Sequence, residues 1–311
     1  MEIQVPTKLI IVGEHLVLCG YSALAVPLPS FSLELKVDLL EQANVQLENF
    51  EISVPLFPNL SGLEDWLPMM RSDADFVKAK FGLKGENFNY KVVMRMPPGS
   101  GGGTSAAWSV ALVKSLVKFA KVNYSEHELL KIVADLEDSH HGGKASGIDH
   151  LTIWRDSPSL LLNGELQLLE FDFFSYPFWN DSRLIFTGLP RETTAEMRKI
   201  VKENIQNAPE ALANFKDQAN LLLDAIAQNN KPKIKEIINS YGIILENVGA
   251  VSDRVKAAAD ELRNQKLAAK VCGAGGATDG SGLLLVYGDI NNIKFDEWLL
   301  KYGFIDLTNS K

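Results

Sequence analysis

The chain has 311 residues, of which 46% are hydrophobic and 23% charged, and its formal net charge is −8. This composition is typical of a globular protein with room for two domains, and an acidic balance without a long basic run disfavours a nucleic-acid partner. No apolar stretch has the length of a membrane span, and the first residues lack a signal-peptide pattern. Because its two cysteines, Cys19 and Cys272, lie far apart, we expect a reduced, cytoplasmic protein without a disulfide.

The segment Glu2–Leu28 is largely apolar, with a few polar side chains inside it. Two strands are predicted around a tight turn at Gly13, the second beginning with the apolar stretch Leu16–Leu18. Lys8, Glu14 and His15 are polar residues inside this otherwise apolar region. Taken alone, a lysine at a strand end and a histidine in a turn have ordinary structural explanations.

Alternation and helical periodicity predict the elements that come next. Two strands are joined by a turn, and a helix interrupted by a proline leads to a third strand. In chain order these elements are Phe31–Val37, the turn Glu41–Asn44, Val45–Ser53, the helix Gly62–Phe81 with Pro68, and Tyr90–Met96.

The stretch Pro97–Trp108 is the most informative part of the sequence. It reads Pro-Pro-Gly-Ser-Gly-Gly-Gly-Thr-Ser-Ala-Ala-Trp and enters an apolar run of helical period, which predicts a buried helix. Glycines at a helix N-terminus let the backbone approach an anion, which the free N–H groups and the helix dipole attract. A flexible turn before a core helix is the alternative. The spacing excludes a Walker A loop and the dinucleotide-binding fingerprint.

A second glycine-bearing loop, residues 140–150, is dense in ionisable side chains. Ser125 and Glu128 predict a capping box for the helix that carries Glu137 towards this loop. Such a cluster is costly to bury without pairing or function, so the loop is a candidate site. Alternatively, it is a solvated connection in which Asp149 is an N-cap. Its three histidines match no zinc-site spacing.

The second half of the chain predicts further strands and helices. A strand pair surrounds Asn163-Gly164, and the stretch Phe174–Asn180 is predicted as a linker with a domain boundary. Thr193 and Glu196 predict a second capping box. The remaining predictions are strands over 183–187, 270–272, 283–287 and 304–307, helices over 209–228, 231–246, 251–265 and 294–301, and a glycine-rich loop over 273–282.

Three segments of the chain resemble motifs of the GHMP small-molecule kinases. Lys8–Pro27 resembles the family's opening Lys…Gly-Glu-His…Gly…Ala-Leu-Ala motif. Pro97–Ala107 resembles its Pro-x-Gly-Ser/Ala-Gly-Leu-Gly-Ser-Ser-Ala loop, and Lys270–Gly276 resembles its Lys-x-x-Gly-Ala-Gly-Gly segment. The three occur in the family's order and span nearly the whole chain, so together they are far more specific than any one alone.

Within this family the chain is most similar to the mevalonate kinase branch. The similarity includes Gly13-Glu14-His15, the loop His141–Asp149, which has one added residue, and the turn Thr187–Thr193. It implies an α+β fold of two domains, with the active site in the cleft between an N-terminal ATP-binding α+β domain and a C-terminal ferredoxin-like α+β domain. We place these domains at residues 1–178 and 179–311.

The resemblance also implies an activity and its partners. The expected reaction is ATP-dependent phosphorylation of the primary hydroxyl of mevalonate, which gives 5-phosphomevalonate for isoprenoid precursor synthesis. ATP and Mg²⁺ are the expected cofactors, and neither nucleic acid nor a membrane is an expected partner. The oligomeric state is open, with a homodimer as one alternative.

The family's functional residues carry over onto matching positions of this sequence. Asp149 is implied as the catalytic base, with Lys8 beside it, and Ser105 and Glu137 are implied as magnesium ligands. Substrate binding is implied for Glu14, His15, Asp149, Thr193 and Gly275. ATP binding is implied for Pro98, Gly99, Ser100, Gly101, Gly102, Gly103, Thr104 and Ser105.

Several departures from the family pattern leave alternatives open. Gly102 stands where the family has leucine, Thr104 where it has serine, and Ala277–Gly280 replaces further glycine and cysteine. These departures concern the substrate more than the fold, so a related kinase acting on phosphomevalonate or a sugar is the enzymatic alternative. A non-catalytic kinase-like regulator is the other alternative, although it predicts loss of the ionisable residues, which are present here.

Overall fold

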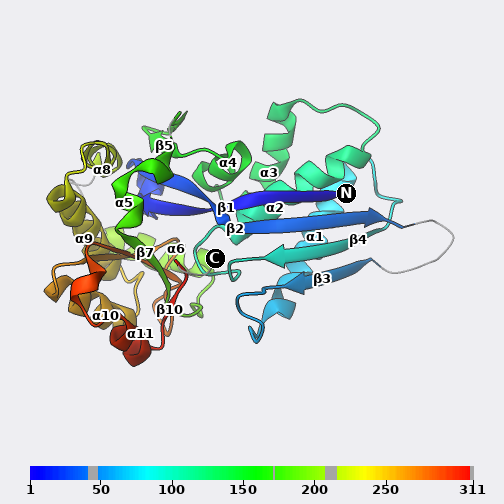
Figure 1. The fold of residues 1–311 in the computed structure, drawn as a ribbon. Helices are drawn as coiled ribbons and strands as arrows, with labels where there is room; N and C mark the ends of the chain where they lie inside the picture. Colours follow the sequence, from blue (N-terminus) through cyan, green and yellow to red (C-terminus); the bar gives the residue numbers. More distant parts are fainter. Residues whose placement is uncertain (41–47, 171, 207–215, 309–311) are drawn as a thin grey trace. The chain divides into compact units, whose positions relative to one another are not determined.

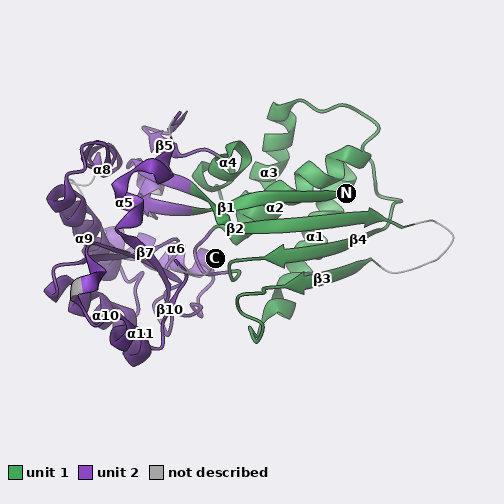
Figure 2. Cartoon of the chain, viewed as in Figure 1, with its two compact units in different colours: residues 1–8, 27–98, 103–156 green, residues 9–26, 99–102, 157–311 purple. Residues whose placement is uncertain are grey.

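The structure is a computed structural model that describes residues 1–40, 48–170, 172–206 and 216–308. Its contacts divide the chain into two compact units, coloured green and purple in Figure 2. Unit 1 comprises residues 1–8, 27–98 and 103–156, and unit 2 comprises residues 9–26, 99–102 and 157–311. The chain therefore passes between the units several times before residue 157. The domain boundary between residues 178 and 179 stays a prediction.

Unit 1 contains a sheet in which a central strand has one antiparallel and one parallel neighbour (Figure 1). Strand β4 (Phe88–Met94) pairs antiparallel with β2 (Ala23–Leu39) and parallel with β3 (Asn49–Ser53). Strand β1 (Glu2–Val12) pairs with β2, and both strands contribute residues to each unit.

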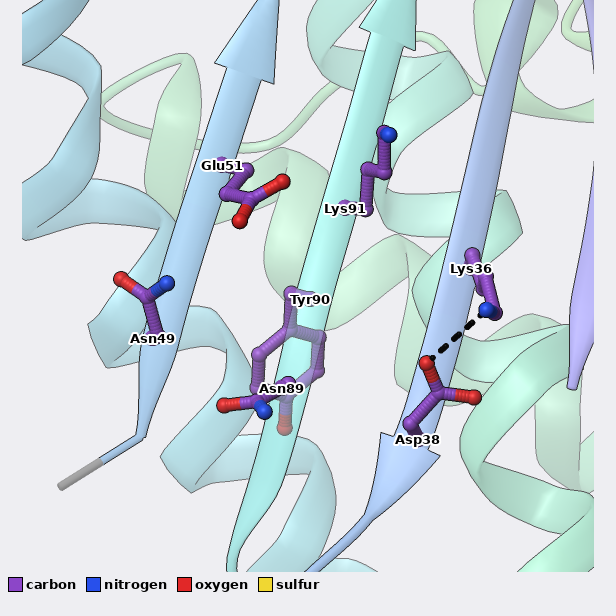
Figure 3. A pocket seen from close by; sticks show the side chains of 7 residues that line it. All are labelled: Lys36, Asp38, Asn49, Glu51, Asn89, Tyr90 and Lys91. Carbon is purple, nitrogen blue, oxygen red and sulfur yellow. Dashed lines mark ion pairs between the residues drawn. The ribbon is translucent and has the colours of Figure 1, made fainter. Parts of the chain in front are cut away.

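Side chains of this sheet alternate between a buried and an outward face, as the period of two in a strand requires. Val37, Phe50 and Tyr90 are buried in the core of unit 1. Their sequence neighbours point outward and, together with Tyr90, line a pocket across three strands (Figure 3). The lining residues are Lys36, Asp38, Asn49, Glu51, Asn89, Tyr90 and Lys91, and none of them was predicted as a site residue.

The helices of unit 1 pack around one nearly encircled helix. In α2 (Thr104–Leu116) every residue except Ser105 and Lys114 is buried, because its sequence is apolar on most of its surface. Contacts to α2 come from three other helices. These are α1 (Leu67–Lys80), α3 (Glu126–His140) and α4 (Ile148–Arg155), with the short 3₁₀ helices η2 (Leu63–Trp66) and η3 (Val117–Phe119) beside α1 and α2.

Unit 2 contains an antiparallel four-stranded sheet in the order β10-β7-β9-β8. All residues of β8 and β9 are buried. A hairpin of two further strands pairs with the first residues of β2, with Ala23 opposite Leu161. The bounds are β5 (Ser159–Leu162), β6 (Glu165–Leu168), β7 (Ser182–Phe186), β8 (Ala268–Cys272), β9 (Leu283–Tyr287) and β10 (Ile305–Asp306).

Helices make up much of the rest of unit 2, and α9 and α10 contact β8. No described helix is long and apolar enough to cross a membrane. The elements are η1 (Leu16–Cys19), η4 (Phe173–Ser175), α5 (Pro177–Asn180), α6 (Thr194–Gln206), α8 (Gln218–Ala227), α9 (Lys231–Asn247), α10 (Asp253–Asn264), η6 (Ile290–Asn292) and α11 (Phe295–Tyr302).

Three predictions about local structure are wrong. Leu16–Leu18 lies in a 3₁₀ helix rather than a strand, because His15 and Gly20, both with positive φ, bend the chain at its two ends. Phe174–Asn180 is not an open linker, since it lies in η4 and α5, where Phe178 is buried. Pro68 does not interrupt a helix but lies in the first turn of α1, where proline is favourable.

The other predicted elements are found within a few residues of their expected ends. The strand Phe31–Val37 is the second half of the longer β2. The predicted turn Glu41–Asn44 and the first residues of the strand Val45–Ser53 lie outside the described residues, as does the start of the helix over 209–228.

Candidate active site

The glycine-rich loop leads into the N-terminus of α2, as predicted. Gly99, Gly101 and Gly103 have φ values of 78°, 93° and 72°, a region that side chains disfavour. Gly103 is the N-cap, and no side chain of the described residues caps this helix. The first N–H groups of α2 therefore have no side-chain acceptor, which is the condition for binding an anion there.

Lys8 and Asp149 come together in unit 1 beside this helix start. Lys8 Nζ lies 3.2 Å from Asp149 Oδ1, and the two side chains are 3% and 19% exposed. A Cβ atom on Gly103 would lie 2.6 Å from Lys8 Cε, so the lysine stem runs directly past this glycine. Asp149 is not an N-cap, because Gly147 caps α4 and Asp149 lies in its first turn. Lys8 of the predicted catalytic pair is thus adjacent to Gly103, a residue of the predicted phosphate loop.

Glu137, the predicted metal ligand, is 1% exposed and hydrogen-bonded through one carboxylate oxygen. Its Oε1 accepts from Ser109 Oγ at 2.9 Å and lies 3.2 Å from His140 Nδ1. Its Oε2 has no hydrogen-bond donor among the described residues and lies 3.6 Å from His141 Nε2.

Histidines keep this buried carboxylate charged. Burial alone raises the pKa of Glu137, but the contacts with His140 and His141 outweigh it and hold the pKa well below its usual range. Burial alone lowers the pKa of His140, but its bonds to Asp73 and Glu137 raise that pKa to about 9. Glu137 is therefore an anion and His140 a cation at neutral pH.

This part of unit 1 fits a magnesium ion that accompanies a nucleotide. An ionised carboxylate with one oxygen lacking a donor is a suitable ligand, and Mg²⁺ commonly uses one or two protein carboxylates together with phosphates. Ser109 Oγ also lies 3.1 Å from the carbonyl oxygen of Ser105, which links the second predicted ligand to Glu137. The described residues contain no group of three or more His, Cys, Asp or Glu side chains that could hold a metal by themselves.

The residues Gly99–Gly102 pack against a second glycine-rich loop within unit 2. A Cβ on Gly101 would lie 2.4 Å from the carbonyl oxygen of Cys272, and one on Gly273 would lie 2.4 Å from Gly101 Cα. The backbones approach so closely that neither position tolerates a side chain. Ser100 is 1% exposed, and its Oγ has no hydrogen-bond partner within the described part of the chain. A buried hydroxyl without a protein partner in this loop is suited to hydrogen-bond a polar ligand.

Glu14 and His15 have protein contacts in unit 2. The Glu14 carboxylate forms a buried ion pair with Lys270, and His15 Nε2 lies 2.9 Å from the carbonyl oxygen of Ala274. Burial lowers the pKa of Lys270, but Cys272 and Glu14 outweigh this effect and raise it. The ion pair and the histidine contact both join the Gly13–His15 turn to the third predicted motif. A substrate contact of either residue stays a prediction.

Thr193 and Gly275 also have structural explanations in unit 2. Thr193 forms the predicted capping box, since its Oγ1 accepts from Glu196 N at 3.3 Å and its N–H donates to Glu196 Oε2 at 2.8 Å. A Cβ on Gly275 would lie 2.0 Å from the carbonyl oxygen of Ala250. Their predicted roles in substrate binding remain predictions.

Two features near the predicted residues were missed from the sequence. Asp73 accepts from His140 and from Trp108, both at 2.9 Å, and no sequence signal connects it to Glu137. Glu192 accepts from Ala277 N, Thr278 N and Thr278 Oγ1. This bonding explains how the departure after Gly276 is accommodated, because the carboxylate binds the backbone of the altered segment.

Comparisons with known proteins bear on this geometry. Residues 70–154 match the family model described as the GHMP kinases N terminal domain. Mevalonate kinase of Pyrococcus furiosus is 23% identical over 289 residues, covering 88% of this chain and 83% of that protein. The crystal structure of Methanococcus jannaschii mevalonate kinase matches with a TM-score of 0.73 at 17% identity, covering 98% of this chain and 97% of that chain.

A related kinase with a different name matches almost as well. Streptococcus pneumoniae phosphomevalonate kinase, in a complex with phosphomevalonate and AMPPNP, has a TM-score of 0.70 at 16% identity and covers 99% of this chain and 98% of that chain. At such identities the structural likeness establishes the fold alone. The predicted α+β fold and the resemblance to GHMP kinases are confirmed.

Proposed function

From the premise that residues 70–154 are a GHMP kinase N-terminal domain, we propose that the chain is an ATP-dependent kinase whose acceptor is mevalonate. The product is 5-phosphomevalonate, formed by phosphorylation of the primary hydroxyl. Pyrococcus furiosus mevalonate kinase, which aligns over 88% of this chain, supports the choice of acceptor.

The observation that carries the catalytic part of the proposal is the pair of Lys8 and Asp149 beside Gly103. Their charged atoms are 3.2 Å apart, and both side chains are largely shielded from solvent. Phosphoryl transfer requires mainly positioning and charge neutralisation from the protein. A buried cation next to a carboxylate, at the uncapped start of a helix, supplies both.

Each residue of the pair has a distinct task. Asp149 accepts the proton of the substrate hydroxyl, and Lys8 offsets negative charge on the transferring phosphoryl group. The N–H groups of Gly99–Ser105 bind the phosphates of ATP, and the buried Ser100 hydroxyl supplies a further hydrogen bond.

Glu137 and Ser105 are the proposed ligands of the magnesium ion, which when bound neutralises charge on the nucleotide phosphates. Glu137 contributes a negative charge, because its contacts with His140 and His141 keep the buried carboxylate ionised. Ser105 is half-exposed at the start of α2, whereas Glu137 is enclosed by the unit.

The proposed substrate residues Glu14, His15, Thr193 and Gly275 all lie in unit 2. Among these, the Thr193 hydroxyl is already engaged by Glu196 and the Glu14 carboxylate by Lys270. His15 Nε2 in turn lies 2.9 Å from the carbonyl oxygen of Ala274. The proposed role of these residues in binding the acceptor therefore rests on the resemblance to mevalonate kinases and not on an unengaged side chain.

Two other functions remain as alternatives to be tested. Phosphomevalonate and sugars are acceptors for kinases of the same fold, and Streptococcus pneumoniae phosphomevalonate kinase matches this chain with a TM-score of 0.70. A non-catalytic regulator is disfavoured because the Lys8–Asp149 pair is retained and assembled.

The proposal is tested by measuring ATP turnover with mevalonate for the wild type and Asp149→Asn. We expect the variant to bind ATP and mevalonate but to lose about 10²-fold or more in kcat, the effect of removing a general base. Lys8→Met is expected to behave similarly. A fully active Asp149→Asn variant would show that the base lies elsewhere or is not needed.

A further inference from the structure

A chain of buried polar contacts joins three helices of unit 1 around Glu137. His140 Nε2 lies 2.9 Å from Asp73 Oδ2, and its Nδ1 lies 3.2 Å from Glu137 Oε1. Trp108 Nε1 donates to the same Asp73 oxygen at 2.9 Å. Asp73 is on α1, Trp108 on α2, and Glu137 and His140 are on α3, so the contacts connect the helices.

These contacts hold the imidazole of His140 at both ends. Each ring nitrogen faces a carboxylate oxygen, and both nitrogens can donate only when the ring is protonated. The side chains of His140 and Asp73 are each 7% exposed. A ring held at both nitrogens in a closed interior cannot rotate without breaking a charged hydrogen bond.

The same contacts distinguish the two oxygens of Glu137. Ser109 and His140 both lie within hydrogen-bond distance of Oε1, whereas Oε2 accepts no hydrogen bond from the described residues and has His141 Nε2 at the longer distance of 3.6 Å. The carboxylate is therefore oriented by one oxygen. In known metal sites, partners that orient a ligand in this way change metal affinity when they are mutated.

We propose that Asp73 and His140 are positioning residues for Glu137, which hold its Oε1 and leave Oε2 for the divalent cation that accompanies the nucleotide. The inference rests on the proposed function only in that Glu137 binds this cation. Neither Asp73 nor His140 touches substrate or the cation. Replacing either residue therefore weakens cation binding and leaves the binding of the nucleotide to the phosphate loop unchanged.

The test is cation binding rather than turnover. Mn²⁺ is titrated into the protein saturated with AMPPNP, and free Mn²⁺ is followed by electron paramagnetic resonance. Asp73→Asn and His140→Gln are expected to raise the Kd for Mn²⁺ about 10-fold or more, the usual size of such effects. The Kd for AMPPNP in EDTA is expected to stay at the wild-type value.

A matched control separates positioning from general destabilisation. Glu48→Gln breaks the ion pair between Glu48 and Lys78, in which Lys78 Nζ lies 2.7 Å from Glu48 Oε1. Lys78 is on α1, the same helix as Asp73. This variant should lower Tm without changing the Kd for Mn²⁺. Unchanged Mn²⁺ binding in Asp73→Asn and His140→Gln, or an equal loss in Glu48→Gln, would overturn the inference.

A wild-type measurement keeps the inference testable if a variant does not fold. Mn²⁺ bound together with AMPPNP must broaden the NMR signals of the His140 ring, because this ring contacts the proposed ligand. Absence of broadening contradicts the inference. An Mn²⁺ affinity equal to that of the wild type in Glu137→Gln also contradicts the inference, but it leaves the mevalonate proposal intact. A preference for another alcohol refutes only the choice of acceptor.

Discussion

Replacing Gly103 by alanine should disable Lys8 while leaving unit 1 folded. The new Cβ would lie 2.6 Å from Lys8 Cε and 2.8 Å from Lys8 Cγ, closer than carbon atoms can approach. The lysine stem has to move by roughly 1 Å, a misplacement that can cost about 10²-fold in rate at a catalytic group. We therefore expect Gly103→Ala to lower kcat by about 10²-fold.

Backbone strain is a separate effect, and the chain offers a control for it. Gly82 has the same φ value, 72°, and a Cβ there would meet no described atom within 4 Å. An alanine in this left-handed region costs about 1–2 kcal/mol at either position. Gly82→Ala should therefore lower Tm through backbone strain alone, and its kcat should be that of the wild type.

The assay is steady-state ADP release with mevalonate, together with thermal melts and a double variant. If the loss acts through Lys8, Gly103→Ala added to Lys8→Met should reduce kcat no further, since the two effects are not independent. A loss that persists in full in the Lys8→Met background would place it in the phosphate loop instead. Wild-type kcat in Gly103→Ala would refute the reasoning altogether.

Three further predictions concern single side chains. Thr193→Ala should lower stability by about 1 kcal/mol through the lost cap, whereas Thr193→Ser should not; a raised KM for mevalonate in Thr193→Ala would show a substrate role as well. Ser105→Ala should raise the Mg²⁺ concentration needed for half-maximal turnover, and an unchanged requirement would remove Ser105 from the ligands. Burial raises the pKa of Glu192, but its bonds from Thr278 and Ala277 outweigh this and lower the pKa below the usual 4.5. The carboxylate therefore stabilises the fold above about pH 4.5 and loses this effect as the pH falls through its folded-state pKa. In thermal melts from pH 3 to 8, the stability difference between wild type and Glu192→Gln should shrink at the acid end. A difference that stays constant with pH would contradict the assignment.

Local patterns in the sequence predicted much of the fold because their causes are local. The long apolar run after Gly103 has a helical period and predicts a buried helix, and α2 is buried almost throughout. The capping boxes at Ser125 and Thr193 each need only two residues three positions apart, and both form. The strand predicted at Leu16–Leu18 is wrong because three apolar residues are too few to show a period that distinguishes a strand from a 3₁₀ helix.

The contacts of the candidate site could be predicted only in part. Lys8 and Asp149 were expected together from a resemblance, and they lie 3.2 Å apart. Asp73 could not be found, because its position on α1 has no pattern that connects it to His140, which is 67 residues later in the chain. The pairing of Glu14 with Lys270 joins residues 256 positions apart and likewise depends on tertiary packing.

The central claim is tested most directly by a substrate panel of mevalonate, phosphomevalonate, galactose and homoserine with ATP and Mg²⁺. For each alcohol kcat/KM is measured, and the phosphorylated position is assigned by phosphorus NMR. The account predicts the highest kcat/KM for mevalonate and a phosphate ester on its primary hydroxyl. A higher value for phosphomevalonate, galactose or homoserine would contradict the assigned acceptor, and no ATP turnover with any alcohol would contradict the kinase itself.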